Sequence, residues 1–67
     1  MLSIVVNGSF RVCTDQTTVA DLIRELALEG KRVAVERNGE IVPKSRLAET
    51  PLANGDRIEV VRAVGGG

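Results

Sequence analysis

The segment Thr17–Lys31 reads TTVADLIRELALEGK, and its apolar residues recur with the spacing of an α-helix. Four of them fall at positions i, i+3, i+4 and i+7 and so share one helical face: Val19, Leu22, Ile23 and Leu26. Thr18 and Asp21 stand three residues apart, as in a capping box, and Gly30 suits the left-handed position after a helix end. We therefore predict one amphipathic helix that starts after Thr18 and ends just before Gly30.

The residues before this segment alternate between apolar and polar, which is typical of a β-hairpin. In residues 2–13, LSIVVNGSFRVC, the dipeptide Asn7-Gly8 separates two alternating runs. Asn-Gly supplies the positive φ angles that a two-residue hairpin turn requires. We expect a hairpin over about Leu2–Cys13, with Cys13 as a small buried hydrophobe at its end.

The residues after the predicted helix indicate a second, shorter hairpin. Val33 and Val35 occupy alternate positions, and the dipeptide Asn38-Gly39 then provides another turn. The returning strand runs through Ile41 and stops at Pro43, because proline has no N–H to donate to a sheet.

The remaining residues predict a loop and one last strand. Segment 43–56, PKSRLAETPLANGD, contains both prolines of the chain, and we expect it to be a loop held to the core by Leu47 and Leu52. Residues 57–61, RIEVV, place Ile58 and Val60 on one face of a strand.

This order of elements predicts the α+β fold class. A right-handed crossover lets the last strand lie parallel to the first at the centre of the sheet. The result is a β-grasp: a mixed sheet of four to five strands with one helix across one face. We expect residues 1–62 to form this domain and residues 63–67 to be a flexible C-terminal glycine tail.

Composition excludes several classes of protein. Nine basic and nine acidic side chains give a formal net charge of zero, whereas a nucleic-acid-binding protein needs a basic surplus. No apolar run is long enough to cross a membrane. The single cysteine cannot form an intramolecular disulfide, so we expect a soluble protein of the reducing cytoplasm, with neither nucleic acid nor membrane among its partners.

Catalytic chemistry has few candidate residues. The chain has no histidine, which excludes a Ser-His or Cys-His pair and an imidazole metal site. Asp21, Glu25 and Glu29 recur every four residues, which is typical of a solvated helix face. We therefore expect a protein that is not an enzyme and that binds no metal or cofactor of its own.

The sheet face away from the helix is a candidate docking surface. Val5 and Val61 have the opposite parity to the inward residues of their strands, and Arg57 and Glu59 share that face with them. Two valines on adjacent central strands near the end of the chain favour a partner-docking patch. The alternative is that they are β-branched residues suited to any strand.

The glycines at the end of the sequence, Gly65, Gly66 and Gly67, do not help to stabilise a fold. One interpretation is a frayed terminus without function. The other is that a bare backbone threads a narrow channel in a partner and presents an unhindered carboxyl carbon. A carboxylate is a poor electrophile, so an enzyme holding ATP would have to activate it.

Three segments carry a family resemblance that covers the whole chain: residues 18–43 (TVADLIRELALEGKRVAVERNGEIVP), residues 52–61 (LANGDRIEVV) and the terminal GGG. They resemble the ThiS family, the ubiquitin-like sulfur carriers of thiamine thiazole synthesis. Gly66 and Gly67 match the terminal Gly-Gly of that family, and Gly65 stands where relatives often have alanine or another small residue.

The resemblance implies a chemical role for the last residue. A ThiF-like adenylyltransferase, using ATP and magnesium, adenylates the carboxylate of Gly67. Sulfur from a cysteine-persulfide donor converts the adenylate to a thiocarboxylate, which a ThiG-like thiazole synthase accepts. Three alternatives stay open: a related carrier for molybdopterin or cysteine synthesis, a modifier conjugated to lysines, and a plain interaction module.

Overall fold

The computed structural model describes residues 1–62. The predictions for Gly65, Gly66, Gly67 and the flexibility of segment 63–67 lie outside the described residues. Over the described part, the elements follow in this order: β1 (Leu2–Val6), β2 (Ser9–Cys13), α1 (Val19–Glu25), β3 (Val33–Arg37), β4 (Glu40–Val42), the 3-10 helix η1 (Lys44–Glu49) and β5 (Arg57–Arg62).

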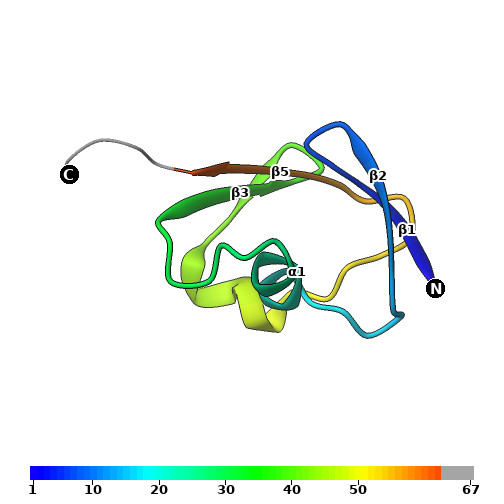
Figure 1. Ribbon diagram of the computed structural model, residues 1–67, viewed down its shortest axis with the longest axis horizontal. Helices are drawn as coiled ribbons and strands as arrows, with labels where there is room; N and C mark the ends of the chain where they lie inside the picture. The colour runs from blue at the N-terminus through cyan, green and yellow to red at the C-terminus, as the bar shows by residue number, and fades with distance from the viewer. Residues whose placement is uncertain (63–67) are drawn as a thin grey trace.

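The strands form one mixed sheet in the order β2-β1-β5-β3-β4. β1 and β5 pair in parallel at its centre, and the other neighbouring strands are antiparallel. α1 and η1 lie together on one side of the sheet (Figure 1). This is the predicted α+β, β-grasp arrangement, including the parallel pairing of the first and last strands.

Both hairpins turn at the predicted Asn-Gly dipeptides. Asn7 and Gly8 have φ angles of 50° and 83°, and Asn38 and Gly39 have φ angles of 52° and 87°. Positive φ at both central residues is what a type I′ turn requires. The Asn7 side chain also extends the sheet, because its Oδ1 accepts the N–H of Val60 at 2.8 Å and its Nδ2 donates to the carbonyl of Val60 at 3.2 Å.

The start of α1 confirms the predicted capping box. Oγ1 of Thr18 accepts the N–H of Asp21 at 3.1 Å, and the Asp21 carboxylate accepts the N–H of Thr18 at 3.0 Å. The hydrogen bond from the Thr18 backbone is the main reason that the pKa of Asp21 lies below its usual value. The chain therefore enters α1 in a fixed direction.

The predicted end of the helix was wrong, because α1 ends at Glu25 and residue 27 already has a φ of 61°. The N–H groups of Ala27 and Leu28 donate to the carbonyls of Arg24 and Ile23, both at 3.0 Å, which is a Schellman motif. The early end lets Leu28 pack against the core. Glu29 consequently lies beyond the helix and not on its solvated face.

The segment after β4 also differs from the predicted loop. Residues 44–49 form η1, and the N–H of Arg46 donates to the carbonyl of Pro43 at 2.8 Å. Leu47 is half-buried against the core, and Leu52 is 5% exposed. The two leucines do hold the segment to the core, and the tight turn of η1 brings Leu47 to the same side as α1.

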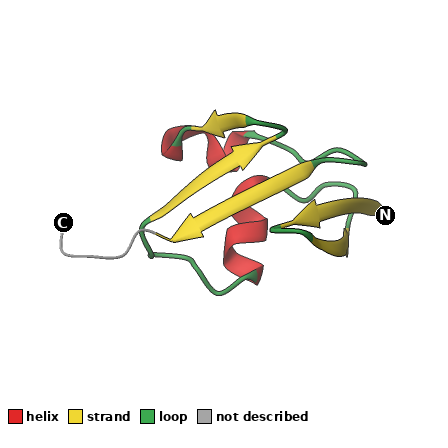
Figure 2. Ribbon diagram, turned by 90° about the horizontal axis from the view of Figure 1, so that it is seen from above, coloured by secondary structure: helices red, strands yellow, loops and turns green. Residues whose placement is uncertain are grey.

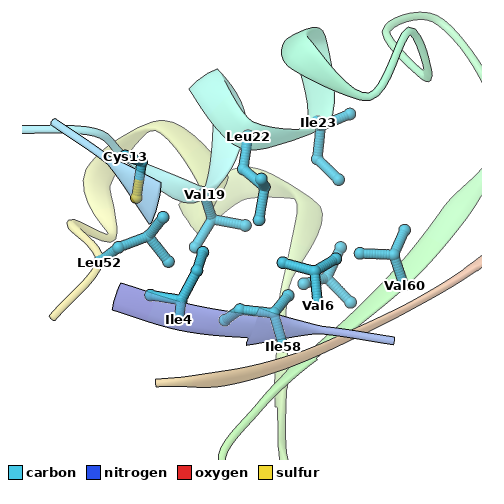
Figure 3. Packing of buried hydrophobic residues seen from close by; sticks show 10 residues of the cluster. Ile4, Val6, Cys13, Val19, Leu22, Ile23, Leu52, Ile58 and Val60 are labelled. Atoms are coloured by element: carbon cyan, nitrogen blue, oxygen red, sulfur yellow. The ribbon is translucent and has the colours of Figure 1, made fainter. Parts of the chain in front are cut away.

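The core lies between α1 and the inner face of the sheet. Figure 3 shows side chains of α1 pointing toward those of β1 and β5, and the buried hydrophobic residues are Ile4, Val6, Cys13, Val19, Leu22, Ile23, Val35, Leu52, Ile58 and Val60. Three of the four predicted helix positions are buried, and Leu26 is half-buried. Cys13 is buried at the end of β2, as predicted.

Candidate functional site

The face of the sheet opposite α1 carries the predicted docking residues. Figure 2 shows this face with β5 and β3 in front of α1, and within residues 1–62 no helix covers it. We call it the outer face. Arg57, Glu59 and Val61 are exposed on β5, and Val5 is half-buried on β1.

The register separates the two valines that sequence reasoning placed together. Val5 lies beside Arg57, since β1 pairs with β5 only at Val5–Arg57 and Val6–Ile58. Val61 is four residues further along β5, which is about 13 Å at the usual rise per residue. Its cross-strand neighbour is Ala34 on β3. The outer face therefore has two apolar areas, one at Val5 and one at Val61 with Ala34.

Sequence reasoning missed three exposed apolar side chains on the outer face: Phe10, Val12 and Ile41. Phe10 is 71% exposed and lies directly opposite Val5, while Val12 lies opposite Ser3. Ile41 is 64% exposed at the far edge of the sheet. The two-residue turn at Asn7-Gly8 could have identified Phe10 and Val12, because it fixes which residues of β1 and β2 face each other.

A pair of like charges lies between the two apolar areas. Glu59 on β5 is directly opposite Glu36 on β3, and both side chains are exposed. Like charges at such positions repel each other across a sheet. The pair favours a partner that brings a cationic group to this place.

Strand β5 belongs to the outer face and ends at Arg62, the residue before segment 63–67 in the sequence. Its last residue, Arg62, pairs with Val33 on β3. In Figure 1, β5 ends at the opposite end of the molecule from Met1. A protein that contacts Val61 is therefore within a few residues of the predicted reactive glycines.

The beginning of β5 is fixed by a buried carboxylate. Asp56 has a side chain that is 6% exposed and accepts hydrogen bonds from Nε of Arg37 at 2.9 Å, from Nδ2 of Asn38 at 2.9 Å and from the N–H of Ala53 at 2.8 Å. Burial raises the pKa of Asp56, but these hydrogen bonds and the Arg37 charge outweigh it and leave the pKa below its usual value. The three hydrogen bonds give the carboxylate a structural role, because they join β3, the turn after it and the loop before β5.

Metal-ligating side chains do not gather anywhere in the part of the chain that the structure describes. Within residues 1–62, no three His, Cys, Asp or Glu side chains gather in a group that could hold a metal ion. The Cys13 thiol is buried. Over the same residues, no helix is long and apolar enough to span a membrane.

Comparison with known proteins agrees with this architecture. The ThiS family model matches residues 4–67. The sulfur carrier protein ThiS of Bacillus subtilis is 49% identical over 53 residues, which are 79% of this chain and 80% of that protein. The crystal structure of the thiamine biosynthesis protein ThiS from Geobacter metallireducens superposes with a TM-score of 0.83 at 28% identity, covering 98% of this chain and 100% of that one.

A longer relative is named as a thiazole synthase and not as ThiS. A thiazole synthase of Paramagnetospirillum magneticum is 44% identical over 66 residues, or 98% of this chain. The present chain spans only 20% of the length of that protein.

The fold and the open sheet face define a small ubiquitin-like β-grasp protein. Because the family model covers nearly all of its residues, the chain belongs to the ThiS family. The relative from Bacillus subtilis is named as a sulfur carrier protein.

Proposed function

We propose that the chain carries sulfur for thiazole formation in thiamine biosynthesis, as a thiocarboxylate on Gly67. The observation that carries this proposal is the family match, which runs through the whole domain to Gly67 itself. The reaction needs partners, because residues 1–62 offer neither a histidine nor a metal-binding group.

The proposed chemistry has three steps. The carboxylate oxygen of Gly67 attacks the α-phosphorus of ATP, which is bound with magnesium in a ThiF-like adenylyltransferase, and pyrophosphate leaves. A sulfur nucleophile from a cysteine persulfide then attacks the acyl-adenylate carbon, and AMP leaves. Reductive cleavage of the acyl disulfide by a thiol yields the thiocarboxylate.

A ThiG-like thiazole synthase is the proposed acceptor. The relative from Paramagnetospirillum magneticum supports this, because its name is thiazole synthase and one part of it resembles this chain over 66 residues. A carrier domain and an acceptor domain in one protein would act on each other. We propose that here the same contact forms between this domain and a thiazole synthase.

The outer face supports the proposal, because it offers a docking surface that extends along β5 as far as Val61. Val5, Val61, Arg57 and Glu59 are its predicted members, and the exposed Phe10 joins them. Aromatic side chains and arginines that become buried at an interface supply much of its binding energy, and the charges improve orientation and association rate. Docking fixes the domain, and the glycines then need little space to enter a channel.

The experiment is a thiocarboxylation assay followed by intact mass spectrometry. The protein is incubated with an adenylyltransferase of this type, magnesium, ATP and a sulfide source. We expect a mass increase equal to the replacement of one oxygen by sulfur, located at Gly67 by fragmentation. An unchanged mass, while the adenylyltransferase modifies a ThiS protein from another source, would contradict the proposal.

Two variants test whether the carboxylate of Gly67 is the group that accepts sulfur. One extra residue after Gly67 should abolish the reaction, because the carboxylate then no longer meets the α-phosphorus of ATP. Cys13→Ser should keep full activity, because the thiol is buried and has no role in the transfer. Sulfur found on Cys13, or at Gly67 of the extended protein, would contradict the mechanism.

A further inference from the structure

A pocket lies on the helix side of the sheet, away from the outer face. It has a volume of about 200 Å³ and opens between α1, the residues that follow α1, and η1. Figure 1 shows α1 and η1 next to each other on this side. Its apolar wall consists of Ile23, Leu28, Val33 and Leu47, and the last three are only half-buried. The pocket therefore offers apolar surface to a ligand.

The edge of this pocket is strongly basic. Arg24 forms ion pairs with Asp21 at 3.1 Å and Glu29 at 3.3 Å, so its charge is compensated. Lys31, Arg32 and Lys44 also line the pocket, and none of them has an ion-pair partner within residues 1–62. Because the whole chain has a formal net charge of zero, these three cations are a local excess.

The wall of the pocket is preorganised. The backbone after α1 is fixed by the Schellman hydrogen bonds and by a turn in which the N–H of Lys31 donates to the carbonyl of Leu28 at 2.9 Å. A fixed loop loses little entropy when it binds a ligand. The volume is below the roughly 300–1,000 Å³ of pockets for small molecules and cofactors, and it suits one large apolar side chain.

We propose that this basic pocket docks an acidic peptide segment of a partner protein, with one apolar side chain of that segment seated against Leu28, Val33 and Leu47. The excess positive charge of the pocket edge favours the carboxylates of the peptide. The apolar wall favours one apolar side chain placed between those carboxylates in the peptide sequence. This surface goes beyond the proposed function and does not depend on the thiocarboxylate chemistry.

The basic pocket lies near the end of β5 and on the opposite side of the sheet from the outer face. Val33 lines the pocket and pairs with Arg62 at the end of β5. A segment bound there lies near Arg62, the last residue that the structure describes, and leaves the outer face free. The two sides of the sheet can therefore hold two different proteins at once.

The test is an NMR titration of the ¹⁵N-labelled protein with the capped peptide DEDLFDED. We expect saturable shifts of the amides of Leu28, Lys31 and Val33, weakened by added salt because the charges are exposed. The control peptides are DEDSSDED, which lacks the apolar anchor, and KRKLFKRK, which reverses the charge; neither should bind. Shifts confined to the outer face, equal binding of a control peptide, or no saturation by DEDLFDED would each overturn the proposal.

Charge-reversal variants on one element provide the matched comparison. Lys44→Glu should weaken binding of DEDLFDED by about tenfold or more, since it places a like charge against the peptide. Arg46→Glu makes the same change on η1 outside the pocket and should weaken binding much less. Ala20→Leu, which fills the pocket from α1, should also prevent binding. Equal losses for Lys44→Glu and Arg46→Glu would show general attraction and overturn the pocket assignment.

Discussion

Single polar side chains connect the loops of this protein to its last strand, and Asp56 makes the most contacts of this kind. It joins Arg37 and Asn38, at the end of one hairpin strand, to the backbone just before β5. Asn38 adds a further link, because its Oδ1 accepts the N–H of Arg57 at 2.9 Å. β5 therefore starts in a fixed place, and the outer face takes its position from it.

Asp56 predicts how stability depends on pH. Its pKa is lowered in the folded protein, so its ionised form stabilises the fold above the unfolded value of about 3.9, and this contribution is lost as pH falls through the folded pKa. Asp56→Asn should lower stability at pH 7 and flatten the loss of stability between pH 7 and acid. Urea denaturation at several pH values measures both effects. An Asp56→Asn protein with the pH profile of the original would contradict the assignment.

The elements show where sequence patterns were sufficient and where they were not. The capping box and both Asn-Gly turns could be predicted because they depend on residues within three or four positions of each other. The end of α1 could not, because Ala27 has no preference for positive φ. The packing of Leu28 against the core imposes that conformation on it. Tertiary contacts override local preference in the same way at η1.

Two opposite substitutions test the end of α1. Ala27 has a φ of 61° and Gly30 a φ of 80°. Ala27→Gly should stabilise the protein by about 0.5–1 kcal/mol, because removal of Cβ relieves more strain than the added freedom of the unfolded chain costs. Gly30→Ala should destabilise it by a similar amount, although no atom lies within 4 Å of the added Cβ. Denaturant midpoints compare them, and changes of the same sign would contradict this account.

Across the whole molecule, the sheet separates the core from the predicted docking site. The sequence predicted the residues of the inner face better than the arrangement of the outer face. The alternation of Ile58 and Val60 with Arg57, Glu59 and Val61 correctly predicted which residues face the core. Distances along the outer face could not be predicted, because they depend on the register of the parallel pair β1 and β5. That register depends on contacts between residues far apart in the sequence, such as the N–H of Asn7 donating to the carbonyl of Ile58 at 2.9 Å and Oδ1 of Asn7 accepting the N–H of Val60 at 2.8 Å.

The Glu36–Glu59 pair on the outer face predicts that one substitution will raise stability and impair function. Glu36→Lys replaces a like-charge pair with an opposite-charge pair across β3 and β5, which should stabilise the free protein by a few tenths of a kcal/mol up to about 1 kcal/mol. The same change removes half of the acidic site offered to a cationic partner group. In the thiocarboxylation assay, KM for this protein should therefore rise while kcat stays unchanged.

The control for Glu36→Lys is Glu49→Lys, which makes the same charge change at an exposed position of η1, on the other side of the sheet. It should leave KM close to that of the original protein, since η1 does not contribute to the outer face. A variant that becomes more stable and binds its enzyme less well cannot owe the loss to misfolding, so Glu36→Lys separates docking from folding. An equal rise in KM for both variants would show that overall charge matters rather than this face, and an unchanged KM for Glu36→Lys would remove the acidic pair from the docking surface.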